Sequence, residues 1–292
     1  MNIKVSVCVL SWNHEKYIEQ CIQSIIDQSF QEFEFIFLDN ASTDATYEKA
    51  VALLEKLTVP TIILRNERPK KISENLNLLY AKARGKYITS FSGDDWWATN
   101  NLEVKVAYYE AHPEIGLLYG SGWIYYDDAG TYEEVNTSKF MSGYVFDDLI
   151  NGNFIFAIGF MTKADVMKKI GKWNESIQIE DWDMWLRIAK EYPIDYILTP
   201  TAYYRRHSSN VSSVGNKEYY DDLMRILSPY KDHKGYKKSQ KKLVELAIYH
   251  EVKYYPTPSS FQVILKHFRL QPFYFKQLLK LFFSPLRRIS ES

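Results

Sequence analysis

The chain has 292 residues, of which 46% are hydrophobic and 25% are charged. This composition is typical of a globular protein and argues against extensive disorder. The 36 basic residues balance the 36 acidic residues, so the formal net charge is zero. A chain without net charge has no overall electrostatic attraction to nucleic acid, and we expect no nucleic-acid partner.

The sequence indicates a cytoplasmic protein. The first apolar stretch, Ile3 to Leu10, is interrupted by Lys4 and Ser6 and lacks the continuous apolar region of a signal peptide. No apolar run approaches the roughly 20 residues needed to span a bilayer, so we expect any membrane contact to be peripheral. The two cysteines, Cys8 and Cys21, have no metal-ligand spacing and are predicted to be reduced core thiols.

Strand-like and helical patterns alternate over the first ninety or so residues. Such alternation predicts βαβ units and an α/β fold of the Rossmann-like kind, with a mostly parallel central sheet flanked by helices. The predicted strands are 5–10, 33–38, 61–64 and 87–91, and the predicted helices are 17–26, 46–57 and 75–83.

After residue 98 the pattern becomes mixed, which predicts an α+β region. We predict one domain over 1–214, with halves of about 1–97 and 98–214, and a helical C-terminal extension over 215–292. The expected helices of the second half are 101–110, 145–151, 164–170 and 180–191; the expected strands are 115–119, 124–126, 154–161 and one before residue 203, with a turn at 127–130.

Polar residues stand where the predicted strands end, which is where ligands bind in open α/β sheets. Asp94 and Asp95 follow the fourth strand. Two adjacent carboxylates repel one another, and a divalent cation such as Mg²⁺ or Mn²⁺, shared with a substrate diphosphate, would relieve this. The alternative is an acidic helix N-terminus, but the position at a strand end favours the metal.

Ser11, Trp12 and Asn13 follow the first strand, and Asp39 ends the second. A carboxylate at the position of Asp39 can accept hydrogen bonds from a base N–H or a ribose hydroxyl. Its alternative role is to hold the following loop. We therefore expect these two strand ends to face a ligand.

Two further segments carry candidate residues. Glu180, Asp181 and Trp182 begin a predicted helix, where a carboxylate could take a hydroxyl proton while a tryptophan packs against a sugar. Their alternative roles are helix-dipole complementation and core packing. His207, beside two arginines after the last strand, suits phosphate oxygens or a metal, although a surface loop would explain it equally.

Over roughly residues 3–212 these segments together resemble the family 2 glycosyltransferases, which have a GT-A fold. The segment 38–44, Leu-Asp-Asn-Ala-Ser-Thr-Asp, is similar to the family's Asp-Asp-Gly-Ser-Thr-Asp signature, and 77–85 to its Asn-x-Gly-Leu-x-x-Ala-x-Gly helix. The segment 92–95 aligns with the metal-binding carboxylate motif, and Glu180-Asp181 with the acidic pair that holds the base. Ser92 replaces the usual first aspartate, and Leu79 replaces a usual glycine.

The resemblance implies an inverting transfer of a sugar from a nucleoside diphosphate sugar, with uridine as the nucleoside, to a glycan or lipid-linked acceptor in cell-surface polysaccharide assembly. It implies a divalent cofactor, Mn²⁺ or Mg²⁺. The implied roles are base for Asp181; metal for Asp95 and Asp94; donor binding for Ser11, Trp12, Asn13, Asp39, Asn77, Asp94 and His207; and acceptor binding for Glu180 and Trp182.

Two alternative functions fit the same pattern. The first is a non-catalytic relative that binds nucleotide sugars, because a fold does not prove activity. The second is a sugar nucleotidyltransferase, which the absence of a glycine-rich basic loop after the first strand disfavours.

The last 32 residues, 261–292, are predicted to contain two apolar helical stripes. The segment has six basic residues and one acidic residue, a net charge of plus five. Such a segment suits the headgroup region of an anionic membrane. Docking of the two helices on the catalytic domain is an equal alternative.

Overall fold

The structure is a computed structural model that describes residues 3–210 and 218–254, together with 265, 273 and 276–278. The chain divides into two compact units. The first comprises Met1–Leu149, Asn153–Ser176 and Glu180–His207, and the second comprises Ile150–Gly152, Ile177–Ile179 and Ser208–Ser292. The two short segments that interrupt the first unit were not expected from the sequence.

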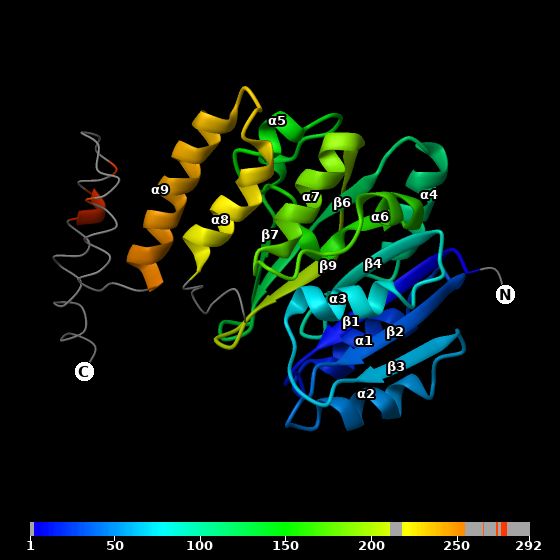
Figure 1. Cartoon of the computed structure of the whole chain (residues 1–292). Helices are drawn as coiled ribbons and strands as arrows, with labels where there is room; N and C mark the ends of the chain where they lie inside the picture. The colour runs from blue at the N-terminus through cyan, green and yellow to red at the C-terminus, as the bar shows by residue number, and fades with distance from the viewer. Residues whose placement is uncertain (1–2, 211–217, 255–264, 266–272, 274–275, 279–292) are drawn as a thin grey trace, which may run out of the picture. The chain divides into compact units, whose positions relative to one another are not determined.

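Four parallel strands form the first half of the sheet, in the order β3-β2-β1-β4. Helices connect successive strands, as Figure 1 shows, so the predicted βαβ units are confirmed. The strands are β1 (Val5–Ser11), β2 (Phe33–Asp39), β3 (Thr61–Arg65) and β4 (Tyr87–Ser92), and the helices are α1 (Ile18–Ile26), α2 (Thr46–Leu54) and α3 (Ile72–Tyr80).

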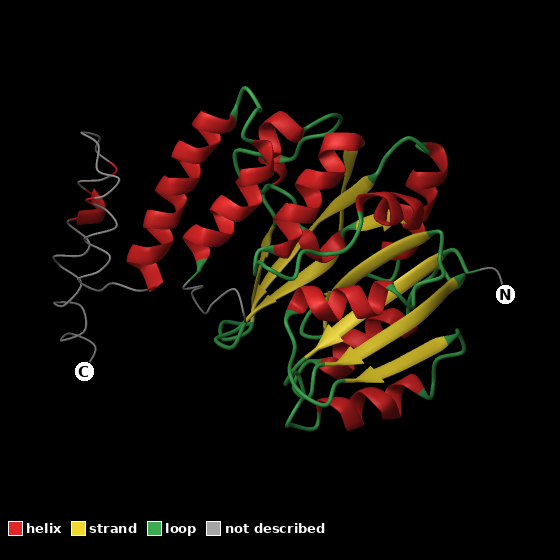
Figure 2. Ribbon diagram, in the orientation of Figure 1, coloured by secondary structure: helices red, strands yellow, loops and turns green. Residues whose placement is uncertain are grey.

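The second half of the sheet is mixed, and the order continues from β4 through β8, β6 and β9 to β5. Figure 2 draws the strands in yellow and the helices that flank them in red. β6 and β9 are parallel, whereas β8 is antiparallel to both of its neighbours, and β5 and β7 are antiparallel to β9 and β6. The α/β class is confirmed, with a sheet less parallel than predicted. The strands are β5 (Trp96–Trp97), β6 (Leu117–Tyr126), β7 (Thr131–Glu134), β8 (Met161–Lys163) and β9 (Ile194–Arg206).

Two predictions about this half were wrong. The strands predicted at 115–119 and 124–126 form one strand, β6, which passes through a bulge at Gly120 and Gly122. The predicted strand at 154–161 is a loop with a 3-10 turn at Ala157–Gly159, and β8 begins only at Met161. The apolar residues of this loop pack against the core, and periodicity alone cannot distinguish such a segment from a buried strand.

The remaining helices of the first unit lie where the sequence predicts them. Gly171, with φ of +92°, ends α6, because a glycine adopts this left-handed conformation without strain. The helices are α4 (Asn101–Ala111), α5 (Phe146–Leu149), α6 (Ala164–Ile170) and α7 (Glu180–Glu191).

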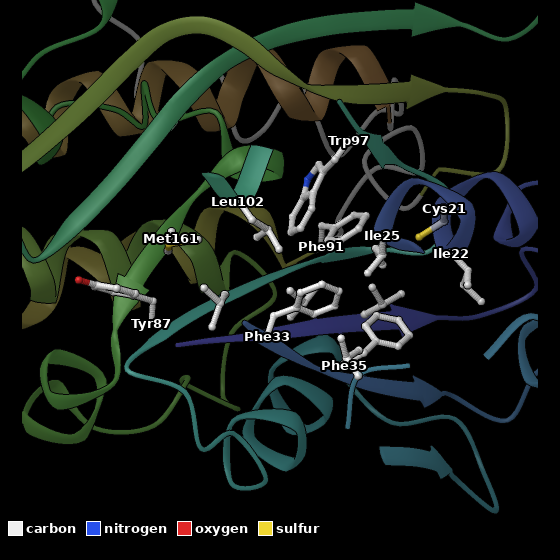
Figure 3. Close-up of a cluster of buried hydrophobic side chains, with 14 of the residues drawn as sticks. Cys21, Ile22, Ile25, Phe33, Phe35, Tyr87, Phe91, Trp97, Leu102 and Met161 are labelled. Atoms are coloured by element: carbon white, nitrogen blue, oxygen red, sulfur yellow. The ribbon is translucent and has the colours of Figure 1, made fainter. Parts of the chain in front are cut away.

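The core of the first unit lies between the sheet and its helices. Figure 3 shows aromatic side chains from β2, β4 and β5 meeting aliphatic and sulfur-containing side chains of α1. Phe91 and Trp97 stack with ring centroids 4.1 Å apart. Cys8 and Cys21 are buried free thiols, as predicted, and burial raises the pKa of both, so both stay protonated.

The second unit contains α8 (Tyr219–Leu227) and α9 (Tyr236–Tyr254), in agreement with the helices predicted beyond residue 215. Val244, Ile248 and Val252 of α9 form its apolar cluster. None of the helices in the described ranges is long and apolar enough to cross a membrane. The predicted membrane-contacting segment, 261–292, lies outside the described residues except at 265, 273 and 276–278, and stays a prediction.

Candidate active site

The carboxyl ends of β1, β2 and β4 meet at one edge of the sheet. Ser11 pairs with Asp39 in the parallel register, and Leu10 pairs with Ser92. The chain leaves β4 through a turn that holds Asp94 before β5 begins. The strand pairing therefore brings Ser11, Asp39 and the turn that holds Asp94 to this edge.

The loop after β1 is held tightly against the loop after β2. Asn13 adopts a positive φ of 56°, its backbone N–H donates to Ser42 Oγ at 2.9 Å, and its Oδ1 accepts from the Thr43 N–H at 2.9 Å. The amide of Asn13 thus fixes the loop geometry. Trp12, in contrast, is 45% exposed, so its ring remains accessible to a ligand.

Asp39 is fully buried, and its two carboxyl oxygens differ in their contacts. Its Oδ2 accepts from the Ser42 N–H at 3.0 Å and lies 3.3 Å from Arg65 Nε. Its Oδ1 is buried and has no hydrogen-bond partner within the part of the chain that the structure describes. Because an unsatisfied buried acceptor is costly, this atom indicates a ligand that donates a hydrogen bond.

Asp94 lies between two histidines. Its Oδ2 is 3.1 Å from His207 Nε2 and 3.7 Å from His14 Nε2. Burial alone would raise the pKa of Asp94, but the hydrogen bond with His207 and the proximity of His14 lower it to about 2. The carboxylate is therefore ionised at neutral pH.

Sequence reasoning did not identify His14. Its Nδ1 lies 3.2 Å from Ser11 Oγ and its backbone N–H donates to Thr46 Oγ1, so the loop after β1 directs Nε2 toward Asp94. Burial lowers the pKa of His14 more than the nearby carboxylates raise it, which favours the neutral imidazole. Its position three residues past a strand end was the available signal.

Asp95 faces the protein interior. It is 2% exposed, and its Oδ1 accepts from the Arg205 N–H at 2.9 Å. Burial and the charge of Asp94 raise the pKa of Asp95 well above that of an ordinary aspartate. These contacts join the turn after β4 to β9, and the predicted role of Asp95 as a metal ligand stays a prediction.

Arg205, which lies on β9, holds the Asp94 turn through hydrogen bonds. Its Nε donates to the Asp94 carbonyl oxygen at 3.0 Å, and its Nη1 donates to Asp127 Oδ1 at 2.7 Å. The guanidinium also lies 4.7 Å from the Tyr17 ring and 4.6 Å from the Trp96 ring. The guanidinium of Arg205 is therefore engaged by groups of the protein.

The predicted base, Asp181, lies in the first turn of the acidic helix α7. Asp181 Oδ2 accepts from Asn153 Nδ2 at 3.2 Å, and its Oδ1 accepts from the Trp182 N–H at 2.6 Å. Loss of water around the carboxyl raises the pKa of Asp181, and these two hydrogen bonds oppose the rise. Among the described residues, Asp181 has no hydrogen bond or ion pair with Asp94 or His207.

Two other predicted binding residues have protein partners. Trp182 is 2% exposed and its Nε1–H donates to the Leu149 carbonyl, so its ring packs in the core rather than facing an acceptor sugar. The side chain of Asn77 donates to the Trp173 carbonyl oxygen and accepts from the Trp173 backbone N–H. It also donates to Glu175 Oε1 at 2.7 Å. The other predicted acceptor residue, Glu180, is half-buried at the first position of α7.

The residues at the strand edge fit a divalent cation shared with a substrate. No three His, Cys, Asp or Glu side chains within the described ranges are placed to hold a metal ion by themselves. Asp94, His14 and His207 nevertheless supply one carboxylate oxygen and two imidazole nitrogens, and a diphosphate would supply further oxygen ligands.

The carboxyl edge of the sheet thus combines a buried aspartate, Asp39, with the ionised Asp94 and its two histidines. The comparison with family models makes the class specific. The model described as glycosyl transferase family 2 matches residues 6–171, more than half of the chain. The chain belongs to the family 2 glycosyltransferases.

Two curated relatives show the extent of the likeness. An uncharacterised glycosyltransferase of Methanocaldococcus jannaschii is 27% identical over 197 residues, which cover 66% of this chain and 67% of that protein. The Escherichia coli enzyme WfgD, named as a UDP-Glc:α-D-GlcNAc-diphosphoundecaprenol β-1,3-glucosyltransferase, is 26% identical over 220 residues, which cover 73% of this chain and 81% of WfgD.

Solved structures share the GT-A fold. S. aureus TarS 1–349 in complex with UDP-GlcNAc superposes with a TM-score of 0.68 at 17% identity, covering 97% of this chain and 81% of that one. A mannosyltransferase of Pyrobaculum calidifontis in complex with GDP-Man and Mn²⁺ has a TM-score of 0.57 at 15% identity, covering 100% and 88%. At these identities the likeness shows the fold alone.

Proposed function

We propose that the chain is a metal-dependent, inverting glycosyltransferase that transfers a sugar from a UDP-sugar to a hydroxyl group of a glycan or lipid-linked acceptor. Its role would be the assembly of a cell-surface polysaccharide. The observation that carries the proposal is the ionised Asp94 carboxylate, which lies between His14 and His207 at the strand edge of a family 2 glycosyltransferase.

The donor nucleoside would bind beside Asp39. Its free, buried Oδ1 is suited to accept one N–H of the base, and the neighbouring loop would hold the ribose. The exposed ring of Trp12 is available to pack against the nucleoside or the sugar. A uracil base is supported by the names of WfgD and of the TarS complex, both of which specify uridine nucleotides.

A divalent ion, Mn²⁺ or Mg²⁺, would be held by Asp94 and His207, with His14 beside them. When bound, such an ion stabilises the negative charge that develops on the leaving diphosphate. Arg205 keeps the Asp94 turn in place by bonding its carbonyl oxygen, so that Asp94 meets the ligand in a fixed orientation. The Mn²⁺ in the mannosyltransferase complex supports this choice of ion.

Asp181 would act as the general base. Its carboxylate would accept the proton of the acceptor hydroxyl as that oxygen attacks the anomeric carbon from the side opposite the departing UDP, which inverts the configuration. Asn153 and the Trp182 N–H hold the two carboxylate oxygens and so orient the base. No covalent intermediate is required.

Replacement of the base tests this proposal. The variant Asp181→Asn keeps the size of the side chain and removes its basicity, so we expect turnover to fall by roughly 10²–10⁴-fold with little change in donor affinity. Desolvation raises the pKa of Asp181, so the carboxylate becomes protonated at a higher pH than an ordinary aspartate does. As the pH is lowered, wild-type turnover should therefore begin to fall before the pH reaches the ordinary pKa of an aspartate. UDP release measured from pH 4 to 8 in the presence of acceptor checks both results.

The matched control is Asp148→Asn, which replaces an exposed aspartate on α5. It should keep wild-type turnover. Near-normal turnover of Asp181→Asn would exclude Asp181 as the base, and a donor that binds without being transferred or hydrolysed at any metal concentration would contradict the enzymatic proposal.

A further inference from the structure

Four aromatic side chains of the first unit form one contact network, here called the aromatic platform: Trp96, Tyr125, Tyr132 and Tyr203. Trp96 and Tyr203 stack with centroids 4.9 Å apart and planes only 3° from parallel. Tyr125 contacts Tyr132 at 4.7 Å and Trp96 at 5.5 Å. Tyr132 completes the ring of contacts with Tyr203 at 6.2 Å.

The strand register places the platform on one face of the sheet. Tyr132 of β7 is opposite Tyr125 of β6, and Trp96 of β5 is opposite Tyr203 of β9. Because alternate residues of a strand share a face, Tyr203 and Arg205 point to the same side of β9, and Arg205 bonds the Asp94 carbonyl oxygen. Two residues of β9, on the order of 7 Å of strand, therefore separate the platform from the Asp94 turn.

Arg205 links the platform to the site. Its guanidinium lies 4.6 Å from the Trp96 ring and 5.2 Å from the Tyr125 ring, and it bonds the Asp94 carbonyl oxygen. The guanidinium of Arg205 thus contacts both the platform and the Asp94 turn. A ligand on the platform would lie beside the reacting groups rather than on a remote surface.

The platform presents accessible ring surface, unlike the predicted acceptor tryptophan. Tyr132 is 54% exposed, Tyr125 and Tyr203 are half-buried, and Trp96 is 8% exposed beneath them. Trp182 is enclosed in the core. Among these aromatic residues, Tyr132 therefore offers the largest open face near the site.

The surroundings of the platform favour a neutral polyhydroxyl ligand. Tyrosine combines an apolar ring with a polar hydroxyl, which matches the C–H face and hydroxyl rim of a pyranose. The same hairpin exposes Glu133 and Glu134, and the turn before it contains Asp127 and Asp128. Glu134, which shares the face of Tyr132, can accept hydrogen bonds from sugar hydroxyls and would repel an anionic lipid surface or a nucleic acid. Asp127 is already paired with Arg205, and Glu133 lies on the other face of the strand.

We propose that the aromatic platform is the acceptor subsite, where a pyranose ring of the acceptor glycan stacks on Tyr132 and Tyr203 while its reacting hydroxyl extends toward the sugar of the donor bound beside the Asp94 turn. This inference rests on the proposed glycosyl transfer and adds the residues that select a saccharide acceptor. Uncharged pyranosides are the expected ligands.

Binding of defined saccharides to the full chain tests the platform. Methyl β-glucoside, cellobiose and chitobiose serve as probes in saturation-transfer NMR, with a saturating UDP-sugar and Mn²⁺ present. Tyr132→Ala should weaken binding roughly three- to tenfold, the loss expected when one aromatic contact is removed. Tyr132→Phe should restore binding, because it keeps the ring.

The control is Tyr144→Ala, which removes a tyrosine that is 77% exposed and lies outside the platform. It should bind the probes like the wild type. Equal binding by Tyr132→Ala and the wild type, or no binding of any probe to a protein that still binds the UDP-sugar, would overturn the platform assignment. If the wild type does not bind the UDP-sugar, the proposed function itself would be contradicted instead.

Discussion

Lys105 is a fully buried amine outside the candidate active site. Its Nζ donates to Asn101 Oδ1 at 2.7 Å and lies 5.5 Å from the Trp97 ring. Burial lowers its pKa from the ordinary 10.5 to about 7. The unfolded chain therefore binds more protons than the folded chain between pH 7 and about 10.5, and stability should rise with pH through this window.

The variant Lys105→Met should remove this pH dependence. We expect the wild type to gain stability relative to the variant as pH rises above 7, by at most about 1.4 kcal/mol per pH unit. Urea unfolding at pH 7, 8 and 9 measures the slope, which is more informative than absolute stability because Asn101 Oδ1 also loses a donor. Lys168→Met, at an exposed position on α6, is the control and should keep the wild-type slope. Parallel wild-type and Lys105→Met slopes would contradict the assignment.

At the scale of elements, the pairing of β6 with β9 decides the geometry of the site. β9 carries Tyr203 and Arg205 and leads to His207, so its distance from β6 sets where these side chains lie. The two strands approach closely at Gly122, where an added Cβ would overlap the Ala202 carbonyl oxygen. Backbone atoms cannot move aside cheaply, so only glycine fits here.

Gly122→Ala should therefore destabilise the protein by about 1–3 kcal/mol, the usual cost of overpacking. Gly120→Ala is the matched control in the same strand, because an added Cβ there meets no atom closer than 3.7 Å. Thermal unfolding of both variants provides the measurement. Similar melting temperatures for the two variants would show that β9 can move away from β6.

For the whole molecule, ligand binding should appear as a gain in stability. A ligand that binds only the folded state adds about 2.7 kcal/mol at a concentration 100 times its Kd. We expect UDP-sugars to raise the melting temperature of the full chain more than GDP-sugars do, and Mn²⁺ to increase the shift. Thermal-shift assays with EDTA and Mn²⁺ check both expectations.

Asp94→Asn provides the specific control for the metal contribution. The variant should lose most of the Mn²⁺-dependent part of the shift, because it removes the ionised carboxylate that His14 and His207 approach. An unchanged Mn²⁺ response in this variant would place the metal elsewhere. A larger shift with GDP-sugars would contradict the choice of uracil.

The sequence alone determined the local features of this protein. The bounds of β1, β2 and α7 follow from hydrophobic periodicity, which reflects contacts within a few residues along the chain. The positions of Asp39 and Asp94 at the strand edge follow as well, because parallel strands end on the same side of a sheet.

The tertiary structure alone decided which side chains meet. His14 approaches Asp94 from another loop, Asp95 turns inward to β9, and Trp182 is buried although its helix was predicted correctly. The aromatic platform likewise joins strands that lie far apart in the chain. These outcomes depend on long-range strand pairing and on competition for burial, neither of which leaves a periodic signal in the sequence.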